Sequence, residues 1–295
     1  MIEYQDHRIA TQGITLQVRE YPLKADAVLF LHFGGANLMM WQRVVPAFQA
    51  HYHLILVDLR DHGKSDKPQA DDDIDQMARD LVGVLDFLKL EQVHIIGSSL
   101  GAEVGLSLAA NYPARVKSLV CDGALYSEYG PYGIWQGSKK EFREHVEKQL
   151  TIIRTRQVEI FTSIQAFIEA RKKSLLKFVA WNKYFEKFVE YDAHPLAAGT
   201  FTRSFQKQAG ENYMSTYFNC RFEEYYRRVE CPVLMVTDDE EPENKLETKA
   251  IEKMSKLPSN GRLAVVHGWD HPYGWMLDPD AMVQVVLGFL SDVSG

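Results

Sequence analysis

The sequence predicts an α/β protein with a mostly parallel sheet that carries helices on both faces. Two observations lead to this prediction: six apolar runs of strand length recur along the chain, and helical patterns lie between several of them. Near-continuous apolar runs are typical of strands buried on both faces, as the strands of parallel sheets are. Alternation of such strands with helices favours a parallel α/β sheet.

The chain is expected to begin with an antiparallel hairpin at the sheet edge, because segment 7–21 alternates in polarity around Gly13. The predicted buried strands are 27–32, 53–59, 92–98, 116–123, 232–237 and 262–267. A helix is expected over 74–90, where Met77, Leu81 and Val84 share one apolar stripe, with Asp71 or Asp73 as its cap. A last helix is expected over 281–293.

The segment 125–229 interrupts this alternation, since about a hundred residues pass without a buried-strand pattern. It is rich in helix formers, charges and aromatic residues, and amphipathic helices are expected over 142–161 and 175–191. The second of these places five aromatic residues near one face: Phe178, Trp181, Tyr184, Phe185 and Phe188. We therefore expect a core formed by 1–124 and 230–295 and a helical cap formed by 125–229, over the sheet end where open α/β sheets bind ligands.

The composition limits the function classes. With 295 residues, 46% hydrophobic and 25% charged, the chain is typical of a globular protein. A net charge of -7 argues against nucleic-acid binding, which needs a basic face. No apolar run is long enough to span a bilayer and the first residues do not resemble a signal peptide, so a cytoplasmic protein is expected. The three cysteines lack metal-ligand spacing, and neither a metal nor a cofactor is expected.

The stretch Gly97-Ser98-Ser99-Leu100-Gly101 matches the G-x-S-x-G pattern, with Ser99 at its centre. A predicted buried strand precedes it and a predicted helix follows it, which is the context in which this pattern forms a sharp turn that exposes a nucleophilic serine. The alternative is a packing turn of small residues. Ser99 is the candidate nucleophile, and Ser98 is off-centre in the turn.

A serine nucleophile needs a histidine base that is oriented by a carboxylate. His271 lies in a loop after the last predicted strand and before the last predicted helix, whereas His267 lies at the strand end and is expected to be structural. The acid should follow strand 232–237. Four carboxylates stand there, and the pattern alone does not choose among them: Asp238, Asp239, Glu240 and Glu241.

Five ordered segments resemble those of the α/β-hydrolase family: LHFGGANLMMW, DLRDHGKSDKP, GSSLGAEVGLSLAANYP, CPVLMVTDDEEPENK and GWDHPYGWMLDP. The resemblance implies an eight-stranded sheet with strand two antiparallel and a cap after strand six. It places the acid at Glu241, with Asp239 as the alternative; Asp122, at the end of strand six, is a third position where some relatives hold it. The resemblance also implies an oxyanion hole formed by the backbone amides of Gly34 and Leu100.

These residues together predict a serine hydrolase that cleaves a small or medium carboxylic ester with apolar character through an acyl-enzyme. The same triad also serves lactonases, amidases, acyltransferases and carbon-carbon bond hydrolases. A cap carboxylate that binds a substrate amine is a further alternative, with Glu186, Glu190 or Glu211 available. In another class, the fold could serve a ligand-sensing or partner-binding protein with slow turnover.

Overall fold

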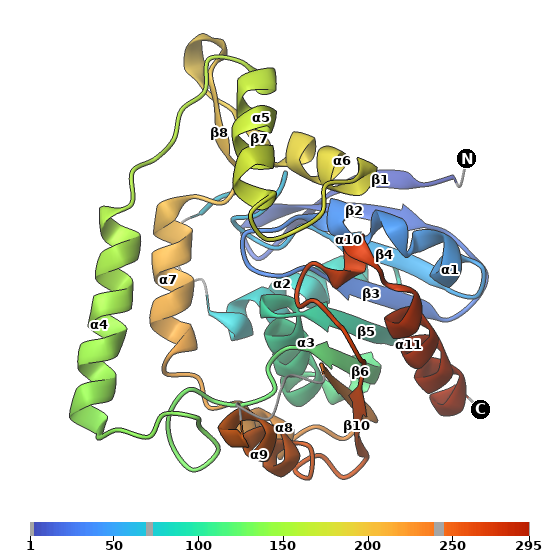
Figure 1. Ribbon diagram of the computed structural model, residues 1–295. Coiled ribbons are helices and arrows are strands. Elements are labelled where there is room, and N and C mark those ends of the chain that lie inside the picture. The colour runs from blue at the N-terminus through green and yellow to red at the C-terminus, as the bar shows by residue number, and fades with distance from the viewer. Residues whose placement is uncertain (1–2, 69–72, 239–244, 295) are drawn as a thin grey trace.

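The computed structural model describes residues 3–68, 73–238 and 245–294. One eight-stranded sheet crosses the molecule in the order β1-β2-β4-β3-β5-β6-β9-β10 (Figure 1). Its strands are Gln5–Thr11 (β1), Ile14–Tyr21 (β2), Ala27–Leu31 (β3), His53–Val57 (β4), Val93–Ser98 (β5), Val116–Asp122 (β6), Val233–Thr237 (β9) and Gly261–Val265 (β10). The β1–β2 and β2–β4 pairs are antiparallel and the other pairs are parallel, which confirms the predicted fold class.

The predicted edge hairpin is present. Gln12 and Gly13 connect β1 to β2 with φ angles of 42° and 81°, the pair of positive values that a two-residue hairpin turn needs. A predicted helix cap is confirmed at Asp73, whose carboxylate accepts the backbone N–H of Gln76 at 2.7 Å.

Helices cover both faces of the sheet. The core helices and helical turns are Leu38–Arg43 (η1), Val45–Gln49 (α1), Ile74–Phe87 (α2), Leu100–Asn111 (α3), Pro113–Arg115 (η2), Lys245–Met254 (α9), Gly274–Leu277 (α10) and Asp280–Val293 (α11). One buried cluster joins α2 and α3 to the sheet, and a second joins η1, α1 and α11 to its other face. These two apolar layers hold the strand ends, where the candidate site lies, in a fixed arrangement.

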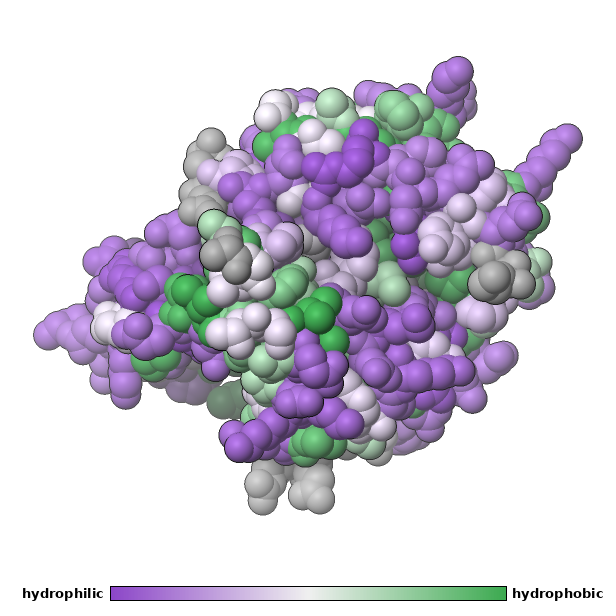
Figure 2. All heavy atoms as spheres, turned by 90° about the horizontal axis from the view of Figure 1, so that it is seen from above, coloured by the Kyte–Doolittle hydropathy of each residue, from purple (hydrophilic) through white to green (hydrophobic). Residues whose placement is uncertain are grey.

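The segment between β6 and β9 is mostly helical. It contains Lys139–Thr155 (α4), Ile164–Leu175 (α5), Lys183–Asp192 (α6), Ala193–Pro195 (β7), Ala197–Gly199 (η3), Phe201–Arg203 (β8), Lys207–Tyr217 (α7) and Phe222–Tyr226 (α8). In Figure 1, α4 and α7 lie side by side to one side of the sheet, while α5 and α6 lie above it. Seen from above, the surface is mostly hydrophilic, with hydrophobic side chains in small groups (Figure 2).

The single helix predicted over 175–191 is wrong. The chain forms α5 and α6 instead, because the Asn182 side chain accepts the backbone N–H groups of Tyr184 and Phe185 and so begins a new helix. The five aromatic residues therefore do not share a face: Phe185 and Phe188 are buried, while Phe178 is 74% exposed.

Candidate active site

Ser99 lies at the sharp turn between β5 and α3. Its φ of 49° and ψ of -118° are a strained combination for a residue with a side chain, and such strain is typical of a nucleophile turn. The backbone N–H of Ser99 donates to the Asp122 carbonyl at 2.6 Å, which ties the turn to the neighbouring strand β6. The turn therefore presents Ser99 at the carboxyl end of the sheet.

The two glycines of the pattern are required by close packing. A Cβ on Gly97 would lie 2.5 Å from the backbone nitrogen of Ala102, and a Cβ on Gly101 would overlap the carbonyl group of Leu31. Both contacts are shorter than real Cβ atoms tolerate. A side chain at either position would therefore force the turn between β5 and α3 to shift.

His271, in the loop between β10 and α10, makes a hydrogen bond with Asp122, which becomes an ion pair when the imidazole is protonated. Its Nδ1 lies 2.8 Å from Asp122 Oδ1, and its side chain is 38% exposed. A bond at Nδ1 fixes the ring and leaves Nε2 as the nitrogen that can take a proton. Asp122 itself is buried at the end of β6.

Asp122 accepts three more hydrogen bonds. Trp269 Nε1 donates to Oδ1 at 3.0 Å, while Trp275 Nε1 and Ser98 Oγ donate to Oδ2 at 2.7 Å and 2.9 Å. Ser98 is fully buried, so its hydroxyl serves the carboxylate. Four donors around one buried carboxylate stabilise its ionised form.

The two pKa values move in the directions that a base and its orienting acid need. Burial alone would raise the pKa of Asp122, but the charge of His271 and the hydrogen bonds hold it below its ordinary value. Burial also acts to lower the pKa of His271, but the Asp122 charge and hydrogen bond outweigh it and raise that pKa above 6.5. An imidazolium formed at this position is therefore stabilised.

Ser99 and His271 open into one cavity of about 760 Å³. Gly34 and Asp122 also line it. Its apolar walls include Ala124, Leu125, Met214, Phe222, Val236, Ile251, Leu263, Val265 and Trp269. Tyr213 and Tyr217 of α7 contribute aromatic side chains to the wall, whereas none of the five aromatic residues of 178–188 lines it. A cavity of this size suits a small organic molecule.

The predicted oxyanion donors are near each other. A Cβ on Gly34 would lie 3.8 Å from the Cβ of Leu100, and Leu100 occupies the first turn of α3, where backbone N–H groups lack partners within the helix. The positive end of the helix dipole also favours developing negative charge there. Both residues thus lie next to the turn that carries Ser99.

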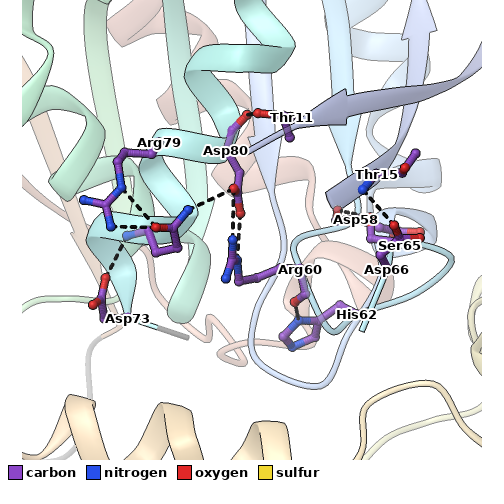
Figure 3. A network of polar contacts seen from close by, with 11 residues as sticks. Thr11, Thr15, Asp58, Arg60, His62, Ser65, Asp66, Asp73, Arg79 and Asp80 are labelled. Atoms are coloured by element: carbon purple, nitrogen blue, oxygen red, sulfur yellow. Dashed lines mark hydrogen bonds and ion pairs between the residues drawn. The ribbon is translucent and has the colours of Figure 1, made fainter. Parts of the chain in front are cut away.

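A buried polar network holds the loop that contains Gly34. His62 Nε2 accepts the N–H of Gly35 at 2.8 Å, and His62 Nδ1 bonds the carbonyl of Arg60 at 2.8 Å. Figure 3 shows this contact beside the buried Arg60–Asp80 ion pair, whose nearest atoms are 2.7 Å apart. The segment after β4 therefore positions the backbone of the candidate oxyanion loop.

Asp58, which follows β4, connects the same segment of the chain to η1 and to α6. Its carboxylate accepts the N–H of Leu38 at 2.7 Å, the N–H of Lys64 at 2.8 Å and the hydroxyl of Tyr191 at 2.9 Å. Because Tyr191 belongs to α6, the helical segment is fastened to the loop beside the candidate site.

The structure brings together Ser99, His271, Gly34 and Leu100, all four of which the sequence singled out. Glu241, the predicted acid, and its alternative Asp239 lie outside the described residues. Asp122, the third candidate acid from the sequence, is the carboxylate that forms a hydrogen bond with His271. His267 is exposed and is not part of the cavity wall.

The indole donors of Asp122 were missed. Trp269 and Trp275 lie close to the predicted base in the sequence. A buried indole N–H needs an acceptor, so this pair of tryptophans was the signal that an acceptor lies nearby.

Among the described residues, no group of three or more His, Cys, Asp or Glu side chains could hold a metal ion. No helix of that described part is both long and apolar enough to cross a membrane.

A family profile described as the alpha/beta hydrolase fold matches residues 26–272, so the chain belongs to the alpha/beta hydrolase family. Among solved structures, E-2-(acetamidomethylene)succinate hydrolase has a similar fold, with a TM-score of 0.76, 23% identity and coverage of 98% of this chain and 100% of that one. This likeness supports the fold.

The curated relatives include a hydrolase and a lactonase. The chain is 26% identical over 290 residues to 2-(acetamidomethylene)succinate hydrolase of Mesorhizobium japonicum, covering 96% of this chain and 94% of that protein. It is 33% identical over 118 residues to 3-oxoadipate enol-lactonase 2 of Acinetobacter baylyi, covering 40% of this chain and 44% of the lactonase. That second match therefore spans less than half of the lactonase.

Proposed function

We propose that the protein is a serine hydrolase that cleaves a small or medium carboxylic ester through an acyl-enzyme. One observation supports this most directly: a strained Ser99 opens into the same cavity as His271, and His271 is bonded to a buried carboxylate. These are the three groups that acyl transfer by serine needs.

In this mechanism His271 Nε2 takes the hydroxyl proton of Ser99 while Ser99 Oγ attacks the ester carbonyl carbon. Asp122 holds the ring through Nδ1–H and stabilises the imidazolium, which makes Asp122 our proposed triad acid in place of Glu241. The N–H groups of Gly34 and Leu100 stabilise the oxyanion, and His271 returns the proton to the leaving alcohol. Water then attacks the acyl-enzyme, with His271 as base, and releases the acid.

The apolar wall of the cavity supports a substrate with apolar character, and residues 125–229 would act as the cap that closes over it. The substrates in the names of the relatives do not suit this cavity. Their names describe succinate and oxoadipate derivatives, which are carboxylates, whereas the described wall of this cavity contains no Lys or Arg that would pair with them. A lactone is an ester, so lactone hydrolysis is the alternative that the same groups perform with least change.

Replacing Ser99 by Ala tests the proposal with short-chain aryl esters and matching lactones as substrates. Turnover should fall to the level of the buffer reaction, and the wild-type protein should give an acyl adduct on the peptide that contains Ser99 when the reaction is quenched early. Ser107→Ala, a buried serine on the same helix that bonds Asp75, is the matched control. Undiminished turnover by Ser99→Ala would overturn the assignment. If the wild-type protein turned over none of the substrates, a sensing or binding role would be favoured.

A further inference from the structure

A buried carboxyl group with one unused oxygen lies beside the candidate nucleophile. Glu103 follows Ser99 by one turn of α3, so both residues lie on the same side of that helix, and both line the cavity. Only 3% of Glu103 is exposed. Tyr213 donates its hydroxyl hydrogen to Glu103 Oε1 at 2.9 Å, and Oε2 is buried without a hydrogen-bond partner in the described part of the chain.

Leaving a carboxyl oxygen buried and unsatisfied is costly, and native proteins rarely do so without a functional reason. The groups around Glu103 do not supply a positive charge. They are neutral or acidic: Tyr213, Tyr217, Cys220, Tyr226 and Glu128. Oε2 is therefore an oxygen of the cavity-lining side chains that remains able to accept a hydrogen bond from a substrate group.

The rest of the cavity shows which charge that group would carry. Its described wall contains five acidic residues and no Lys or Arg: Glu103, Asp122, Asp238, Glu247 and Glu252. The one basic side chain of that wall, His271, is bonded to Asp122, so the remaining acidic residues are in excess. A cavity lined mostly by one sign of charge attracts ligands of the opposite sign and disfavours anions. A substrate carboxylate would thus meet repulsion here, whereas a protonated amine would donate a hydrogen bond and neutralise charge.

We propose that Glu103 is a specificity-determining residue whose Oε2 binds an ammonium group of the substrate. The proposal rests on the proposed hydrolase function and adds a substrate class to it: esters that carry a protonated amine close to the acyl group attacked by Ser99. Tyr213 is then a positioning residue, because its hydroxyl occupies Oε1 and leaves Oε2 as the oxygen that can accept from the substrate.

The pKa of Glu103 agrees with this assignment. Burial raises the pKa of Glu103 to about 8, with the hydrogen bond from Tyr213 acting to lower it and the charge of Glu128 acting to raise it. An ammonium group in the cavity would favour the ionised carboxylate and bring that pKa down.

The cap carboxylates considered from the sequence are placed differently. Glu186 and Glu190 are exposed on α6, and Glu211 makes an ion pair with Arg154 at 2.6 Å. None of the three lines the cavity. Amine recognition would therefore belong to the core helix that begins at the nucleophile.

Three probes of equal length and different charge test the proposal without any turnover: n-hexylammonium, n-hexanol and n-hexanoate. Their affinities for the wild-type protein are measured by titration calorimetry at about pH 8.5, where the amine stays protonated and Glu103 is mostly ionised. Hexylammonium should bind about tenfold or more tightly than hexanol, as expected for a hydrogen bond between charged groups, and hexanoate should bind most weakly.

Glu103→Gln keeps the shape of the side chain and removes its charge, so the ratio of hexylammonium to hexanol affinity should fall toward one. Glu186→Gln, an exposed glutamate of α6, is the matched control and should leave that ratio unchanged. Equal binding of the three probes by wild type overturns the proposal even if the Glu103 variant fails to fold, and so does an ammonium preference that survives in a folded Glu103→Gln protein.

The two proposals can fail separately. An ammonium preference that depends on Glu103, together with undiminished ester turnover by Ser99→Ala, supports the binding site and overturns the acyl-enzyme mechanism. Loss of turnover in Ser99→Ala without any ammonium preference supports the mechanism and overturns the role of Glu103.

Discussion

Asp122→Asn is the most informative single change, because it separates our proposed triad acid from the carboxylates after β9. The carboxylate accepts four hydrogen bonds, two on each oxygen. An asparagine side chain has one oxygen that can accept two of them. If that oxygen faces His271 and Trp269, the new NH₂ group faces the N–H of Trp275, while the Ser98 hydroxyl can rotate to accept from it.

The substitution therefore leaves one indole N–H without an acceptor in a buried site, which should lower the free energy of unfolding by about 1–3 kcal/mol. The larger effect should be on catalysis, because the imidazolium of His271 loses its counter-charge. The corresponding change in serine proteases lowers kcat by about 10⁴-fold, and we expect kcat/KM for an aryl ester to fall by about 10³ to 10⁴-fold.

The pH profile distinguishes a lost counter-charge from simple misfolding. In Asp122→Asn only burial and the weaker surrounding charges would act on His271, so the acidic limb of kcat/KM should move to lower pH than in wild type. Glu241→Gln and Asp239→Asn, measured in the same assay, should change kcat/KM by less than about threefold, because the proposed mechanism gives neither carboxylate a role. A large loss in Glu241→Gln with near-normal activity in Asp122→Asn would refute the reasoning.

Three further outcomes are expected. Wild-type kcat/KM should decline as the pH falls through a midpoint above 6.5, because His271 must be neutral to act as base and Asp122 raises its pKa; a midpoint below 6.5 in a pH–rate profile would contradict this. Gly101→Ala should lower the free energy of unfolding by about 1–3 kcal/mol in urea titration, since the new methyl group meets the Leu31 carbonyl, and unchanged stability would show that the turn can yield. Arg60→Leu should lower the free energy of unfolding by about 3–5 kcal/mol in the same titration, because the buried carboxylate of Asp80 loses its guanidinium partner. A decrease of less than about 0.5 kcal/mol would argue against a buried ion pair.

The positions of the central strands could be predicted from the sequence because burial on both faces forces a continuous apolar pattern. The burial predicted for strand 262–267 is wrong, since β10 is an edge strand in which Leu263 is 38% and Val265 49% exposed. The predicted run 92–98 is β5 to within one residue, and 116–123 is β6 to within one residue. The break at Asn182 could not be read from apolar spacing, since the aromatic pattern continues across it and a side-chain cap outweighs that pattern.

The partner of the base was harder to predict for a geometric reason. The β5–β6 register sets Ser98 directly beside Asp122, but both strands are buried at nearly every position, so no alternation of polarity carries register information. The cluster of carboxylates after β9 offered a more visible candidate in the sequence. Only the register and the two indoles together single out Asp122.

The bond from Ser98 to Asp122 has a consequence for how this protein can change over time. If the acid belongs to a central strand and is tied to the nucleophile turn, the acidic segment that follows β9 carries no obligatory catalytic group. Its length and charge are then free to drift or to be exchanged by design, as are the acidic side chains at the cavity edge. Such a division lets selectivity diverge between descendants while the reaction itself is inherited intact.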